Sequence, residues 1–138
     1  MEIFRAQSTD ISRLLLIVDD NLTNSFSGNR GEIIQFLVQA LEQEEERVAV
    51  WMAENDDKHI IGYVIAFNSV VPPAARHVLI AHAYSKGGSD TTQELLKVVR
   101  DWALECGADK IQMATRYPEH FMIYGFKECP EVLMEIEI

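Results

Sequence analysis

The chain has 138 residues, of which 48% are hydrophobic and 25% are charged. This length suits a single domain, residues 1–138, whose core is large enough to fold unaided. The formal net charge of −10 disfavours nucleic-acid binding and favours a cationic or amine-bearing partner. No apolar run is long enough to cross a bilayer, the first residues lack a signal-peptide pattern, and two cysteines are too few for a disulfide framework. The sequence therefore predicts a cytoplasmic protein without membrane contact.

The first half of the chain predicts a strand, two helices and a hairpin. Residues 3–6 form the expected opening strand, and Ser8-Thr9-Asp10 is a helix-start signal. Two apolar stripes at helical spacing follow, separated by a loop near residues 24–31. From Arg47 the apolar period changes to two, and a polar turn leads to a second apolar strand at residues 60–67, which favours an antiparallel hairpin. The helical stripes consist of Ile11, Leu14, Leu15, Val18 and Leu22, and of Ile33, Phe36, Leu37, Ala40 and Leu41.

The second half predicts a strand at residues 77–84, a long helix at 91–106 and a strand at 110–115. Gly107 stands where a left-handed helix cap is expected, and the helical connection favours parallel strands. A short helical turn from Pro118 and a terminal strand complete the chain. The terminal strand would place Val132, Met134, Ile136 and Ile138 on one face. The elements predict an α+β fold around one mixed sheet, in the order β-α-α-β-β-β-α-β-α-β.

The turn before the long helix carries the strongest functional signal. An apolar strand runs into Gly87 and Gly88, and the helix follows directly. A helix start presents unpaired N–H groups and the positive end of the helix dipole, so it can bind an anion through backbone atoms. Glycine allows close approach of those N–H groups to phosphate oxygens, and Lys86 adds a cation beside them.

The same turn also contains possible helix caps. Asp90 with Gln93, and Thr91 with Glu94, both have capping-box spacing. A capping carboxylate would occupy the N–H groups that a phosphate needs. The residues leave both interpretations open, an anion-binding loop and a self-capped helix start.

In its element order the chain resembles the GNAT N-acetyltransferase family over nearly its whole length, from residues 3–10 to residues 119–126. The resemblance implies a splayed sheet that holds acetyl-CoA between the strands at 77–84 and 110–115. It implies transfer of acetyl from this cosubstrate to a primary amine of a small molecule or protein, by direct attack in a ternary complex. The cofactor-binding positions that it implies are Ala83, Tyr84, Ser85, Lys86, Gly87, Gly88, Ser89 and Thr91.

The pyrophosphate loop departs from the family pattern, which reads Arg or Gln, x, x, Gly, x, Gly or Ala. Alignment on Leu95-Leu96 places Asp90 and Thr92 at the two small-residue positions. A slip of one or two residues would use Gly87 and Gly88 instead.

The general-acid motif also departs from the family pattern, which reads Phe-Tyr-x-x-Leu-Gly-Phe. Alignment on Gly125-Phe126 places Phe121 at the tyrosine, and a phenyl ring cannot donate a proton to a thiolate. Tyr124 and Tyr117 are nearby candidates for the acid, as is His120. Alternatively, Tyr124 packs where the family has leucine.

His82 is the candidate general base, because it lies on the strand before the loop and histidine titrates near neutral pH. The expected strand places it on one face with Val78, Ile80 and Tyr84, where it could equally be a packed core residue. The acceptor pocket is expected beside Asp19, Asp20 and residues 24–30. No spacing of His, Cys and carboxylate residues predicts a metal site.

Two functions remain open at this point. One is an acyl-CoA-dependent N-acetyltransferase, and the other is a binding or structural module of the same fold that has lost catalysis. The apolar terminal strand is a candidate edge for a homodimer.

Overall fold

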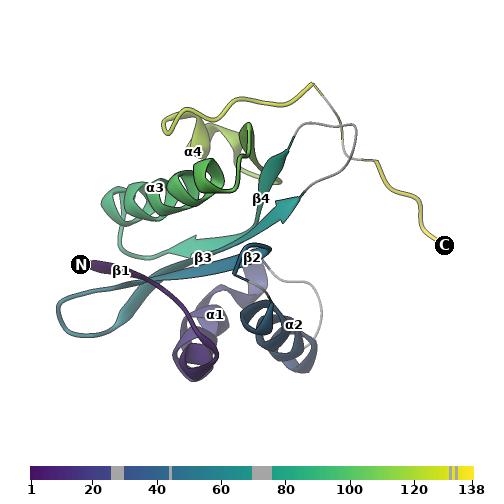
Figure 1. Ribbon diagram of the computed structural model, residues 1–138. Coiled ribbons are helices and arrows are strands. Elements are labelled where there is room, and N and C mark those ends of the chain that lie inside the picture. Colours follow the sequence, from purple (N-terminus) through teal and green to yellow (C-terminus); the bar gives the residue numbers. More distant parts are fainter. Residues whose placement is uncertain (26–29, 44, 70–75, 131, 133) are drawn as a thin grey trace.

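A five-stranded sheet runs through the middle of the molecule, with helices on both faces (Figure 1). The computed structural model describes residues 1–25, 30–43, 45–69, 76–130, 132 and 134–138, with backbone only for 19–25 and 30. The sheet order is β1-β2-β3-β4-β5, in which the first four strands pair antiparallel and β5 pairs parallel with β4. The strands are β1 (Glu2–Arg5), β2 (Val48–Glu54), β3 (Ile60–Ser69), β4 (His77–Ser85) and β5 (Lys110–Met113).

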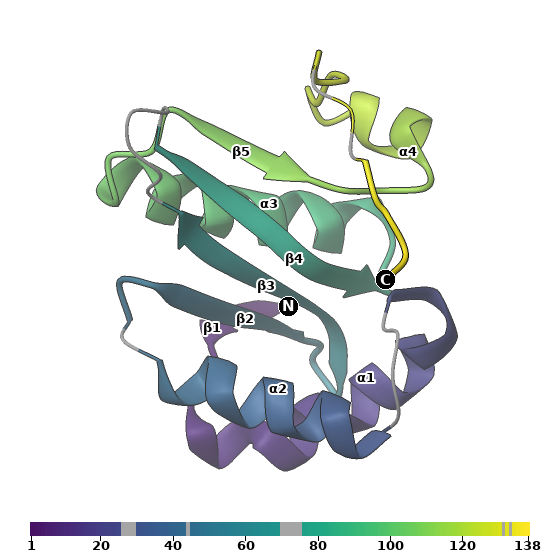
Figure 2. The ribbon, with the colours of Figure 1, turned by 90° about the vertical axis from the view of Figure 1, so that its right-hand side faces the viewer.

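Helices α1 and α2 lie on one face of the sheet and α3 lies on the other (Figures 1 and 2). A short 3-10 turn precedes α1, and α4 follows β5. Gly107 has a φ of +74°, which confirms the predicted left-handed position after α3. None of the described helices is long and apolar enough to cross a membrane. The helical elements are η1 (Ser8–Asp10), α1 (Ile11–Ser25), α2 (Arg30–Glu42), α3 (Ser89–Glu105) and α4 (Pro118–Met122).

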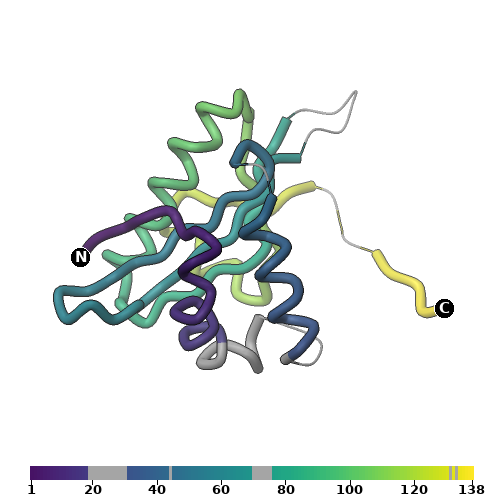
Figure 3. Tube along the Cα trace, turned by 60° about the horizontal axis from the view of Figure 1, so that its bottom comes forward, coloured from purple at the N-terminus to yellow at the C-terminus, as the bar shows by residue number. Residues whose placement is uncertain are grey.

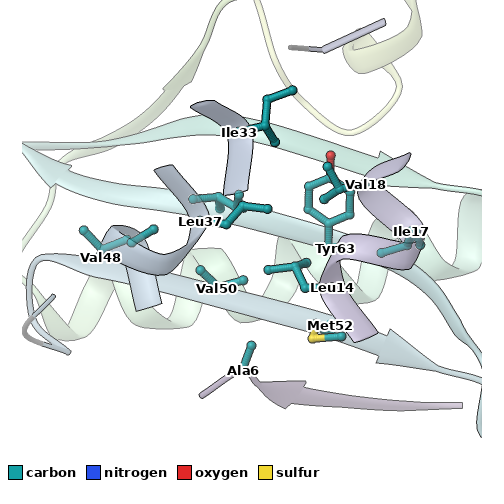
Figure 4. Packing of buried hydrophobic residues seen from close by; sticks show 12 residues of the cluster. Ala6, Leu14, Ile17, Val18, Ile33, Leu37, Val48, Val50, Met52 and Tyr63 are labelled. Carbon is teal, nitrogen blue, oxygen red and sulfur yellow. The ribbon is translucent and has the colours of Figure 1, made fainter. Parts of the chain in front are cut away.

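Strand β2 contributes to the core on both of its faces. Val48, Val50 and Met52 point into the cluster beneath α1 and α2, part of which Figure 4 shows. Ala49, Trp51 and Ala53 belong to the cluster beneath α3. Because successive strand side chains alternate between faces, one seven-residue strand joins the two halves of the core. The predicted period of two is confirmed.

The terminal strand of the prediction is wrong. The described residues after α4 contain no strand, and β5 is the last strand of the sheet. Val132 is 81% exposed and Ile136 is 86% exposed. Alternation gives this segment a preference for extended backbone, but a strand also needs a neighbouring edge, and here the segment leaves the sheet. The other predicted elements are present, and the α+β fold is confirmed.

Candidate functional site

Strands β4 and β5 separate toward their carboxyl ends, as Figure 2 shows. Their parallel register begins at His77 opposite Lys110 and ends at Ile80 opposite Met113. Strand β4 continues to Ser85, whereas the chain after Met113 turns away toward α4. Successive N–H groups of a strand point to opposite edges, so alternate backbone groups of residues 81–85 face the side that β5 has left. These groups can hydrogen-bond a ligand that lies between the two strands.

A β-bulge in β4 lies at the start of this separation. Ile65 pairs with His82 and the next residue of β3, Ala66, pairs with Ile80, so Ala81 is the extra residue. Bulges are common where a strand redirects a side chain beside a site. The expected common face of His82 with Val78 and Ile80 is wrong, because those two residues pack beneath α3. The bulge turns the residues after Ala81 to the opposite face.

His82 and Tyr84 therefore lie on the face that α1 and α2 cover. The His82 ring meets Phe36 of α2 edge-on, with 5.6 Å between ring centroids. The Tyr84 ring lies 6.4 Å from Tyr63 and packs against the cluster beneath α1 and α2. Both candidate residues are half-buried and border the separated part of β4.

The loop at residues 86–88 is anchored at its amino end. The Lys86 N–H donates a hydrogen bond of 2.9 Å to the Ile61 carbonyl, and the Gly87 N–H donates one of 3.3 Å to the Ser85 hydroxyl. These bonds tie the loop to β3 and to the end of β4. The anchored loop carries the backbone directly into α3.

The two glycines serve different steric purposes. Gly88 has a φ of +85°, a conformation that side-chain-bearing residues rarely adopt. A Cβ added to Gly87 would lie 2.2 Å from the Thr91 Oγ1 and 2.8 Å from the Ile61 Cδ1. Neither position accepts a larger residue without a shift of the loop or of the helix start.

The start of α3 has no side-chain cap at its N-cap residue, which is Gly88. Neither capping box that the spacing allows is formed, because each requires Asp90 or Thr91 at the N-cap, where Gly88 stands. Asp90 lies instead in the first turn, and its side chain is exposed. The Thr92 hydroxyl donates a 3.3 Å bond to the Gly88 carbonyl, so this side chain does not cap an N–H group. The first N–H groups of the helix remain suited to an anion.

The predicted cofactor positions come together around this helix start. Ala83, Lys86 and Ser89 are exposed, and Ser85 is half-buried. Thr91 is only 2% exposed, and its hydroxyl lies 3.3 Å from the Met1 sulfur. Thr91 can therefore offer a ligand its backbone N–H, while its side chain packs inward.

Sequence reasoning missed the contribution of β3 to the loop. A Cβ added to Gly62 would lie 3.1 Å from the Leu95 Cδ1 and 3.1 Å from the Tyr84 carbonyl oxygen. The absence of that side chain lets α3 and β4 pack closely against β3. The signal was a lone glycine within the apolar run 60–67, which is typical of a close backbone approach.

The candidate acids lie on the other side of the separation, around α4. Tyr117 is the N-cap residue of α4 and is 68% exposed. Tyr124 follows the helix and is half-buried, with its ring 6.3 Å from that of His120. Phe121 packs against Phe126, with 6.1 Å between the ring centroids.

Two further points from the sequence concern the acceptor pocket and a metal site. The expected border of the acceptor pocket at Asp19, Asp20 and residues 24–30 lies outside the described side chains. Within the described part of the chain, no group of three or more His, Cys, Asp or Glu residues could hold a metal ion.

No family model and no curated protein matches the sequence. Solved structures match over nearly the whole chain. An aminoglycoside 6'-N-acetyltransferase from Acinetobacter haemolyticus has a TM-score of 0.82 at 15% identity, covering 100% of this chain and 99% of that one. A predicted acetyltransferase from Clostridium acetobutylicum, solved with acetyl-CoA, has a TM-score of 0.78 at 21% identity, covering 98% and 95%.

A ribosomal-protein-alanine N-acetyltransferase from Brucella melitensis biovar Abortus has a TM-score of 0.77 at 16% identity and covers 100% of both chains. These similarities show that the protein has the fold of the GNAT N-acetyltransferases. The splayed sheet that the resemblance implies is present in this chain, because β4 and β5 pair only as far as Ile80 and Met113 and then separate (Figure 2).

Proposed function

We propose that the protein is an N-acetyltransferase that moves acetyl from acetyl-CoA to a primary amine. The observation that supports this most directly is the combination of the β4–β5 separation with an uncapped helix start at its mouth. An extended, partly anionic cosubstrate needs both features. The solved structure of similar fold that contains acetyl-CoA supports the same cosubstrate.

In this proposal the pyrophosphate of acetyl-CoA binds the N–H groups at the start of α3. Gly87 and Gly88 allow the close approach, and Lys86 contributes an exposed cation. The pantetheine amides bind the backbone groups that residues 81–85 present toward the separation. Ser85 and Ser89 border the same loop.

The amine nitrogen attacks the thioester carbon in a ternary complex. The base removes one proton from the ammonium so that the free amine attacks, a C–N bond forms, and the C–S bond breaks. The nitrogen loses its second proton to solvent as the amide forms, and the departing CoA thiolate takes a proton from the acid. Backbone N–H groups around Ala83–Ser85 polarise the carbonyl, and orientation supplies much of the rate. We assign the base to His82 and the acid to Tyr124 or Tyr117, since imidazole and phenol can exchange protons in these steps.

Phe121 favours a second candidate, a module of this fold that binds ligand without turnover. In the alignment on Gly125-Phe126 this residue stands where the family has its acid, and its ring packs against Phe126. An enzyme with this residue needs its acid from elsewhere, whereas a binding module needs none. The two candidates therefore differ in turnover and agree in ligand binding.

Calorimetric titration with acetyl-CoA tests the proposal. We expect binding by the wild-type chain and several-fold tighter binding by Asp90→Asn, because the variant removes a negative charge from the first turn of α3. Asp101→Asn on the same helix is the matched control and should leave the affinity unchanged, since helix-terminus effects are confined to the first turn.

Absence of binding heat in all three proteins would overturn the acetyl-CoA assignment. Where binding occurs, release of the free CoA thiol with a panel of primary amines distinguishes the enzyme from the binding module. Turnover supports the transferase, and binding without turnover supports the module.

A further inference from the structure

A cavity of about 780 Å³ lies beside β4 and β5. Leu79 of β4 and Gln112 of β5 line it, and both lie on the sheet face opposite α3, because their strand neighbours pack beneath that helix. Figure 2 shows α3 behind these two strands, with α1 and α2 next to β2 and β3. Residues 134–138 project away from the sheet (Figures 1 and 3) and do not line the cavity. Its volume is within the range of small-molecule sites, roughly 300–1,000 Å³.

The cavity reaches the point where β4 and β5 separate. Ile80 and Met113 form the last pair of the parallel register, and Met113 and Thr115 line the cavity. His82, the proposed base, lies on the same sheet face as Leu79, since its ring contacts α2 rather than α3. A molecule in this cavity can therefore meet an acetyl group held between the strands, on the side of the proposed base.

The charged groups of the cavity are mainly cationic. Lys110 and Lys127 line it, and among the described lining residues Glu128 is the one carboxylate. Both lysines are exposed, and within the described part of the chain no ion pair joins either of them to a carboxylate. This local surplus of positive charge, on a chain with a formal net charge of −10, attracts an anionic group of a ligand.

Apolar side chains separate the lysine at the start of β5 from the strand separation. Lys110 lies three residues before Met113, about 10 Å along the strand at ~3.3 Å per residue. Leu79, Phe121 and Phe126 contribute to the wall, and the two phenyl rings lie 6.1 Å apart. A ligand that spans this distance buries an apolar chain between its two polar ends.

We propose that the cavity binds the acceptor and that the acceptor is an ω-amino acid, a primary amine joined by methylene groups to a carboxylate. The carboxylate binds the Lys110 and Lys127 ammonium groups through charge-assisted hydrogen bonds. The methylene chain packs on the apolar wall, and the amine reaches the separation of β4 and β5. The inference rests on the proposed function, because it names the acceptor of that transfer.

Calorimetric titration with 6-aminohexanoate and with hexylamine, each with and without CoA, tests the proposal without requiring turnover. The two amines have the same chain length and differ in the carboxylate. We expect the wild-type chain to bind 6-aminohexanoate about tenfold more tightly, which is the effect of one charge-assisted hydrogen bond. Equal affinities, tighter binding of hexylamine, or no binding of either amine would overturn the assignment.

Lysine variants test which groups hold the carboxylate. Lys110→Gln combined with Lys127→Gln should remove the preference and leave the affinity for hexylamine unchanged. Lys110→Arg combined with Lys127→Arg keeps both charges and should keep the preference. Lys97→Gln, at an exposed position of α3, is the matched control. Circular dichroism verifies that each variant is folded, and a preference that persists in the folded glutamine double variant would refute the role of the two lysines.

Turnover separates this inference from the proposed function. Where acetyl-CoA is consumed, 6-aminohexanoate should have the higher kcat/KM, and the glutamine double variant should raise its KM with little change in kcat. Absence of acetyl-CoA binding would overturn the proposed function. Acetyl transfer to both amines with equal kcat/KM would overturn the acceptor class alone.

Discussion

At the scale of single residues, Gly87 shapes the candidate cofactor loop through the side chain that it lacks. The space that its Cβ would occupy is filled by the Thr91 Oγ1 and the Ile61 Cδ1. Thr91 is buried in the first turn of α3, so it cannot move away without moving the helix start. The contact therefore couples the loop conformation to the position of the N–H groups at the start of α3.

Gly87→Ala should lower the free energy of unfolding by about 1–3 kcal/mol, the usual cost of an overpacked site. It should also weaken acetyl-CoA binding, because relief of the clash displaces the loop. The added variant Thr91→Ala removes the clashing oxygen, so the double variant should lose less stability than the two single variants combined. Urea denaturation gives the free energy of unfolding of the wild type, the two single variants and the double variant. Strictly additive losses would contradict the steric explanation.

At the scale of elements, local patterns predicted most of the structure. The alternation in β2 and the long helix at 91–106, observed as α3 (Ser89–Glu105), each reflect one element packing on a neighbour, and both predictions are confirmed. The helix cap was not predictable from spacing alone, because several residues fit the capping box and the loop glycine decides which one stands at the N-cap.

The sequence predicted features that depend on pairing between strands less well than it predicted the single elements. Nothing in the residues of β4 marks Ala81 as the bulge, since the extra residue is defined only by the register with β3. Because of the extra residue Ala81, His82 lies on the sheet face opposite to the predicted one, where it contacts Phe36. The terminal segment has a strand pattern, yet the availability of a strand edge decides whether a strand forms.

An ion-paired group joins α1 to the β2–β3 hairpin. Arg13 of α1 contacts Glu54 at the end of β2, and the Lys58 ammonium lies 3.5 Å from the same carboxylate. The hydrogen bond from Arg13 lowers the pKa of the Glu54 carboxyl below its ordinary value. Desolvation by burial acts in the opposite direction and raises this pKa, while the positive charges of Arg13 and Lys58 lower it further. The folded state therefore favours the ionised form.

Because the pKa of Glu54 is lowered by folding, its contribution to stability is present above the unfolded pKa of 4.5 and is lost as pH falls through the folded pKa. Glu54→Gln should thus lower Tm at neutral pH, and the difference from wild type should shrink in acid. Thermal melts across this pH range measure the effect. Asp57→Asn in the exposed hairpin turn is the control, and an equal Tm difference at every pH would contradict the assignment to charge.

At the scale of the whole molecule, the two faces of the sheet are covered unequally. Helices α1 and α2 pack over the cluster that includes β2 and β3, and α3 covers the cluster that extends to β5. Leu79 of β4, on the face opposite α3, is 38% exposed and lines a cavity of about 780 Å³ together with Lys110 and Gln112 of β5. Leu79 is therefore more exposed than its neighbours Val78 and Ile80, which lie beneath α3.

The net charge of the molecule opposes the proposed cosubstrate at long range. The chain carries a formal charge of −10, and acetyl-CoA carries phosphate groups. Attraction at the start of α3 acts over one helical turn, whereas the overall repulsion extends for about a Debye length, ~10 Å at 0.1 M salt. Added salt should therefore screen the repulsion more than it weakens the local contacts.

We expect the association rate constant for acetyl-CoA to rise with ionic strength, while the dissociation rate constant changes less. Stopped-flow mixing over a series of salt concentrations measures both. Acetyl-pantetheine, which lacks the phosphates, is the matched ligand and should associate at a rate nearly independent of salt. If the rate for acetyl-CoA instead falls with salt, cations such as Lys86 govern the encounter, and the local field at the helix start outweighs the charge of the whole molecule.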